Sequence, residues 1–159
     1  MNQARSAGRW LEVLAWADRA DPCTESLGSD DQEAETTVVA ARLAAHRMLG
    51  DYPEALRICT HERETRRNLS DEDQAALGAI AGECLLRLDR HEEVEAWLPE
   101  NHIEDSIRAR LVLSIALSRT GETEKATTLA ASYSAMVGSD PYAADLAGPA
   151  IENEEGDET

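Results

Sequence analysis

Very few side chains in this sequence have the types and spacing that metal chemistry requires. Cys59 and His61 are separated by one residue, as in half of a zinc site. A structural zinc site takes four ligands, usually supplied by two such pairs, and no second pair occurs at ligand spacing. Residues two apart on a helix also point in different directions. We therefore expect no metal site and no cofactor.

The motifs of common enzyme classes are missing from the sequence. It contains no glycine-rich phosphate loop, no Gly-x-Ser-x-Gly elbow and no His-Glu-x-x-His zinc motif. Acidic pairs such as Asp71 and Asp73 occur, but an acid-rich chain produces them by chance, and carboxylates favour the first turn of a helix. We expect a protein that is not an enzyme.

Four arginines form a candidate binding site. Arg47, Arg87 and Arg119 fall near the C-terminal ends of expected helices, and Arg108 falls near the start of another. One hypothesis is a basic strip that engages carboxylates of a protein partner, bidentately where the geometry allows. The alternative is that the helix macrodipole alone favours arginine near a helix C-terminus.

Trp16 is a second candidate for partner binding. It shares an expected helix with Trp10, about 120° away around the axis at about 100° per residue. Trp10 aligns with Val13 and Leu14, so it is predicted to be core. Trp16 lies at the edge of that arc, where an exposed tryptophan would be a binding hot spot. Its alternative role is to pack under the segment that follows the helix.

Composition favours one all-α domain. The 159 residues are one domain's worth of chain, and they include no Phe and only 4% aromatics, so alanine and leucine must fill the interior. Small residues at contacts let helices approach closely.

The charge of the chain excludes some classes of partner, and its apolar runs and cysteines indicate its location. The net charge of −17 disfavours nucleic acid and anionic membranes and keeps an exposed helical array soluble. No apolar run is long enough to cross a bilayer, and no signal peptide is visible. Three scattered cysteines fit a reducing compartment, so we expect a cytoplasmic protein.

Apolar spacing at three and four residues, together with capping and breaking residues, predicts seven or eight helices. Asp21-Pro22 is expected to end the first helix, and a polar linker over 23–30 should follow it. Ser70 is expected to cap the fourth helix, and Pro99 to end the fifth. Residues 152–159 hold five acids and no base, which predicts a disordered acidic tail over 148–159 after a domain of residues 1–147. The expected helices cover about 4–20, 31–49, 52–67, 71–88, 91–98, 104–119, 122–137 and 141–147.

A turn motif recurs four times between expected helices, at Gly8, Gly50, Asp89 and Gly121. The clearest copy reads Gly50-Asp51-Tyr52-Pro53-Glu54-Ala55-Leu56 and resembles the tetratricopeptide repeat (TPR), in which Gly-Asp-aromatic ends a first helix and Glu-Ala-Leu opens a second. The four turn residues are 42, 39 and 32 apart, against a repeat of about 34. The first unit has only seven residues before Gly8, so it lacks its first helix. We expect that leading helix to be unpaired, capping the stack or docking on a partner.

The resemblance implies antiparallel helix hairpins stacked as a short right-handed solenoid, whose concave groove binds a segment of a protein partner. The expected function is that of an adaptor or chaperone, as a monomer or in a hetero-complex. Small size and acidity also resemble the cytosolic chaperones of bacterial type III secretion. The alternative is a structural protein that self-associates through its terminal helices, for example as a homodimer.

Overall fold

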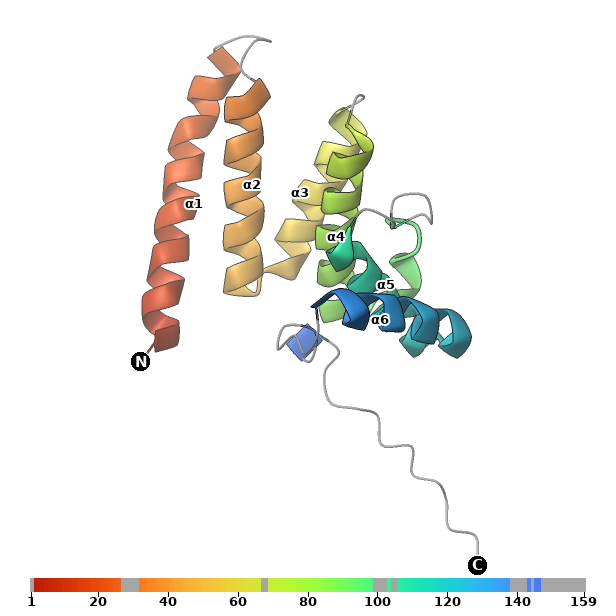
Figure 1. The fold of residues 1–159 in the computed structure, drawn as a ribbon. Coiled ribbons are helices and arrows are strands. Elements are labelled where there is room, and N and C mark those ends of the chain that lie inside the picture. The colour runs from red at the N-terminus through yellow and green to blue at the C-terminus, as the bar shows by residue number, and fades with distance from the viewer. Residues whose placement is uncertain are drawn as a thin grey trace, which may run out of the picture.

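The computed structural model describes residues 2–26, 32–66, 69–98, 103, 106–137, 143 and 145–146. They form only helices and turns, so the expected all-α fold is confirmed (Figure 1). The helices are α1 (Asn2–Ser26), α2 (Gln32–Leu49), α3 (Tyr52–Thr65), α4 (Asp71–Arg87), the 3-10 turn η1 (His91–Glu93), α5 (Ile107–Thr120) and α6 (Thr123–Val137).

Six α-helices are thus present in this part of the chain, against the seven or eight expected. Ala143, Asp145 and Leu146 are helical, as expected for a last helix, but the other residues between 138 and 147 lie outside the described ranges. The expected tail at 148–159 also lies outside them.

The helices pack as three consecutive hairpins. α1 lies along α2, α3 along α4 and α5 along α6, while α2 contacts α3 and α4 contacts α5 (Figure 1). Each element therefore lies against its neighbour in sequence, which is typical of short connections between helices. The leading helix α1, which was expected to lack a helix before it, packs on the helix that follows it, α2.

Three of the four predicted turns are confirmed by their backbone geometry. Gly50, Asp89 and Gly121 have φ values of 77°, 60° and 89°, in the left-handed region. Glycine enters this region without strain, and aspartate is among the few other residues that tolerate it. A helix that ends in this conformation can reverse direction within a few residues.

The predicted turn at Gly8 and the predicted helix end at Pro22 are both wrong. Gly8 and Pro22 lie within α1, which continues to Ser26, so residues 23–26 of the expected linker are helical. A proline inside a helix costs about 3 kcal/mol, so other interactions must hold α1 together. Packing on α2 supplies them: Ala17 is fully buried, and Asp18 accepts a hydrogen bond from Arg42 Nη2 at 3.0 Å.

Side-chain caps fix the starts of three helices. The Ser70 Oγ accepts a hydrogen bond from the Asp73 backbone N–H at 3.1 Å and donates one to the Asp73 carboxylate at 2.6 Å, which confirms the predicted cap of α4. Ser106 Oγ caps α5 by accepting from the Ala109 backbone N–H at 3.2 Å, and Asp51 Oδ1 caps α3 by accepting from the Glu54 backbone N–H at 3.4 Å. Each cap satisfies a backbone N–H that the helix itself leaves without an acceptor.

The expected helix over 91–98 forms only the 3-10 turn η1, followed by turns to Leu98. Eight residues before a proline are too few for a stable helix. The tighter turns place Val94 and Leu98, both at most 1% exposed, in the core. Trp97 is half-buried, and the Arg63 guanidinium stacks on its ring at 3.5 Å from the centroid.

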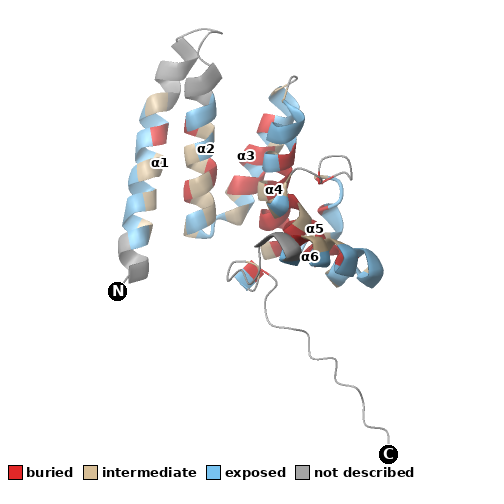
Figure 2. Cartoon of the chain, in the orientation of Figure 1, coloured by how far each residue is buried: buried red, intermediate tan, exposed pale blue. Residues whose placement is uncertain are grey.

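The core is centred on α4 and α5 (Figure 2). Residues Leu111 to Leu117 are all buried, as expected for a helix that is apolar on nearly every side. Gly78 and Gly82 let the η1 segment and α5 approach α4. A Cβ on Gly78 would collide with the Trp97 carbonyl oxygen, and one on Gly82 would lie 2.6 Å from Val112 Cγ1. Packing on α4 therefore requires glycine at both positions.

We predict that Gly82→Ala lowers the free energy of unfolding by about 1–3 kcal/mol, because the added methyl overpacks the contact with Val112. Chemical denaturation followed by circular dichroism measures the change.

The matched control is Gly8→Ala, since a Cβ at this helical glycine meets nothing within 4 Å. It should raise stability by about 0.5–1 kcal/mol, because alanine restricts the unfolded chain more than glycine does. Equal effects of the two substitutions would contradict the packing described here.

Candidate functional site

Glu83 on α4 binds two of the predicted arginines. Its side chain is 6% exposed. Its Oε2 forms an ion pair with Arg47 Nη2 on α2 at 2.9 Å and a second, shorter one with Arg108 Nη2 on α5. The three residues belong to the helices that precede the Gly50, Asp89 and Gly121 turns. We call them the Glu83 cluster.

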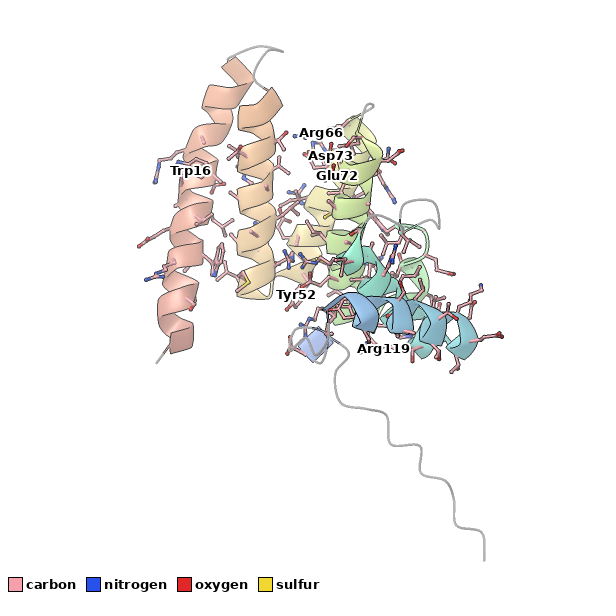
Figure 3. The ribbon with its side chains drawn as sticks, viewed as in Figure 1. Trp16, Tyr52, Arg66, Glu72, Asp73 and Arg119 are labelled. Carbon is pink, nitrogen blue, oxygen red and sulfur yellow. The ribbon has the colours of Figure 1, made fainter. Side chains whose placement is uncertain are left out.

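The other predicted binding residues lie apart from the Glu83 cluster or have partners of their own. Arg87, one turn further along α4, pairs with Asp145 at 2.5 Å. Arg119 lies in the last turn of α5 and is half-buried. Trp16 is 45% exposed on α1, far from Arg119 (Figure 3). Arg47, Arg87 and Arg108 are therefore each already paired with a carboxylate of the protein itself.

Glu83 was not among the residues predicted from the sequence, although the sequence contains a signal for it. Glu83 is the only charged residue in the otherwise apolar run from Ala79 to Leu86. A charge in a buried stretch needs an opposite charge nearby. The run identifies Glu83 as paired, but its partners depend on how α2 and α5 pack on α4, which spacing along the chain does not encode.

Two buried thiols lie beside this cluster. Cys59 on α3 and Cys84 on α4 are both 0% exposed, as expected for small hydrophobic residues of the core. Burial raises the pKa of each thiol to about 12, and neighbouring negative groups add to the effect. These cysteines are thus protonated at neutral pH and are poor nucleophiles.

A pocket of about 800 Å³ lies between α5, α6 and the segment after η1. Its volume is in the range of ligand and peptide pockets. Aliphatic side chains form the floor of the pocket, and charged and hydroxyl side chains surround this floor. The aliphatic residues are Leu98, Ile103, Leu113, Leu117 and Leu129, and the polar ones are Glu95, Arg110, Glu124, Lys125, Thr128 and Ser132.

Most polar groups of this pocket already bind other groups of the protein. Arg110 donates to the Ile103 carbonyl oxygen at 3.1 Å and to Ser132 Oγ at 2.8 Å. Lys125 pairs with Glu122 at 2.6 Å, and Thr128 Oγ1 donates to the Glu124 carbonyl oxygen at 3.1 Å. The arrangement offers an apolar floor and few free hydrogen-bonding groups, so it suits binding better than catalysis.

None of the pocket residues was predicted as a site residue. Leu98 and Ile103 come from a segment that was expected to be a helix end and a connection. Leu113 and Leu129 look like ordinary core residues in the sequence. The pocket forms where the segment after η1 contacts α5 and α6. No local sequence pattern predicts such a contact.

Comparison with models of known protein families, with curated proteins and with solved structures finds no match to this chain. Within the described ranges, no three side chains of the metal-ligating types gather into a group that could hold an ion. In the same residues, no helix is both long and apolar enough to cross a membrane.

We predict that Glu83→Gln destabilises the protein by about 2–4 kcal/mol, because it leaves the charges of Arg47 and Arg108 facing each other without a carboxylate. Denaturant unfolding of the variant and the wild type measures the difference.

The control is Glu93→Gln, which removes the carboxylate of an exposed ion pair with Arg90 at 2.7 Å. Arg90 lowers the pKa of Glu93 through their hydrogen bond, but solvent screens such a pair. Its denaturation midpoint should hardly move. If both variants unfolded at the same midpoint, Glu83 would have no special structural role.

The raised thiol pKa values predict a loss of stability at alkaline pH. Below pH 9.0, the usual pKa of a solvated thiol, Cys59 and Cys84 are protonated in both the folded and the unfolded states, so their stabilising contribution is complete. As the pH rises from 9 towards 12, only the unfolded thiols ionise, which costs about 1 kcal/mol per thiol for each pH unit.

The test is urea unfolding from about pH 8 to 11 of the wild type and of Cys59→Ala/Cys84→Ala. The variant starts less stable because of the cavities it creates, but its stability should fall less steeply with pH. Parallel slopes for the two proteins would contradict burial of the thiols.

Proposed function

We propose that this protein is a protein-interaction module, an adaptor or chaperone, whose hairpins stack as a short right-handed TPR-like solenoid and bind a partner segment. The observation that carries the proposal is the aliphatic pocket between α5 and α6. Binding energy comes from covering that floor, and a preformed pocket reduces the ordering cost to that of the partner.

The arrangement of the Glu83 cluster supports the stacking. Arg47, Glu83 and Arg108 come from the helices that precede three successive turns, and their ion pairs bring those helices together. The charges of the Glu83 cluster are already paired with one another, which leaves the pocket as the better place for a partner.

Self-association through α1 is the alternative function. Leu11 and Trp16 on this helix are 58% and 45% exposed. Large apolar side chains exposed on a terminal helix favour contact with another protein surface. A second copy of the chain would provide such a surface.

We predict that peptides selected from an unbiased random display library against the full-length chain bind in the pocket with micromolar affinity. Thr128→Arg places a long charged side chain over the floor, so it should weaken these peptides by at least about tenfold. Fluorescence anisotropy with labelled peptides measures the affinities.

Thr127→Arg is a closely matched control. Thr127 is exposed on the same helix and, like Thr128, donates its hydroxyl to the carbonyl four residues earlier, at 2.8 Å, but it does not line the pocket. Equal weakening by both variants would refute the pocket as the binding site. Light scattering on the same samples should give the 17.4 kDa monomer. A dimer that Trp16→Glu dissociates would instead support self-association.

A further inference from the structure

The pocket lining carries two carboxylates. Glu95 and Glu124 are exposed, and neither carboxylate forms an ion pair with a described residue. The two cations of the lining, by contrast, bind other groups: Lys125 pairs with Glu122, and Arg110 binds Ser132 and the Ile103 carbonyl. Negative charge is therefore what the pocket offers to a partner.

The net charge of the chain also favours a positively charged partner. At −17 it attracts cations over long range and repels acidic surfaces. A second copy of this chain carries the same −17 and is disfavoured as the occupant. The chain's own residues 152–159, with five acids and no base, are disfavoured for the same reason.

The backbone of the occupant must satisfy its own hydrogen bonds. An extended peptide usually adds to a sheet edge or binds a row of polar side chains. The described part of the chain has no strand, and the Thr128 hydroxyl and the Arg110 guanidinium already donate within the protein. A helix needs no such partners, because its amide groups bond to each other.

We propose that the α5/α6 pocket binds an amphipathic basic helix of a partner protein. Leucine, isoleucine or methionine side chains at three-and-four spacing cover the aliphatic floor, which includes Leu129, and flanking lysines or arginines pair with Glu95 and Glu124. The inference rests on the proposed function, to which it adds the chemistry of the partner. The pairs are exposed to solvent, so the affinity is moderate and falls as salt rises.

The test uses two labelled helical peptides that share the same leucine positions and differ only in whether lysine or glutamate occupies the polar face. Anisotropy titrations against the full-length protein should show the lysine peptide binding at least about tenfold more tightly. The lysine peptide should gain helicity on binding, and a proline at its centre should abolish binding. Equal or tighter binding of the glutamate peptide would overturn the proposal.

Paired variants separate the pocket from the overall charge. Glu95→Gln/Glu124→Gln should weaken the lysine peptide by about tenfold, because both rim pairs are lost. Glu12→Gln/Glu64→Gln removes two exposed carboxylates on α1 and α3, outside the pocket, and changes the net charge equally. Equal weakening by both double variants would show general attraction and overturn the proposal.

The library-selected peptides distinguish the two levels of the argument. If these peptides are sensitive to Thr128→Arg but are not basic, the pocket binds partners of another chemistry, and only this inference fails. If Thr128→Arg changes the affinity of neither the library-selected peptides nor the lysine peptide, both this inference and the proposed function fail.

Discussion

The arrangement of this protein depends on one carboxylate. Glu83 is the point at which α2, α4 and α5 meet through charge, and each of these helices belongs to a different hairpin. Apolar packing between helices is strong but tolerates sliding, whereas an ion pair shielded from water fixes relative positions. Buried ion pairs add little net stability compared with apolar contacts, so we interpret the Glu83 cluster as specifying how the hairpins stack.

Close approach at α4 is the complementary constraint. Gly78 and Gly82 leave room for the Trp97 carbonyl and for Val112, which draws the η1 segment and α5 onto α4. The same approach brings Leu98, Leu113 and Leu117 together in the floor of the pocket. Fold and candidate site are therefore linked, because the glycines that allow the core to close also position the pocket. A second polar contact joins the first two hairpins: Arg66, which follows α3 directly, donates to Thr36 Oγ1 on α2 at 2.9 Å. Figure 3 labels Arg66.

The sequence was a good guide wherever a local rule decides the structure. Left-handed turns at Gly50, Asp89 and Gly121, the Ser70 cap and the burial of α5 all follow from residue type and short spacing. Prediction failed at Gly8 and Pro22, where packing on α2 overrides two helix-disfavouring residues. The site was harder to predict, because Arg47 and Arg108 are recognisable as candidates while Glu83, which neutralises them, and the pocket both depend on contacts between distant segments.

Hydrogen exchange followed by mass spectrometry, on the wild type and Glu83→Gln under native conditions, tests the central claim most directly. If one carboxylate holds three helices together, amides of α2 and α5 near Arg47 and Arg108 should lose protection along with those of α4. A loss of protection confined to α4 would contradict the account, since the hairpins would then be held in place by apolar packing alone.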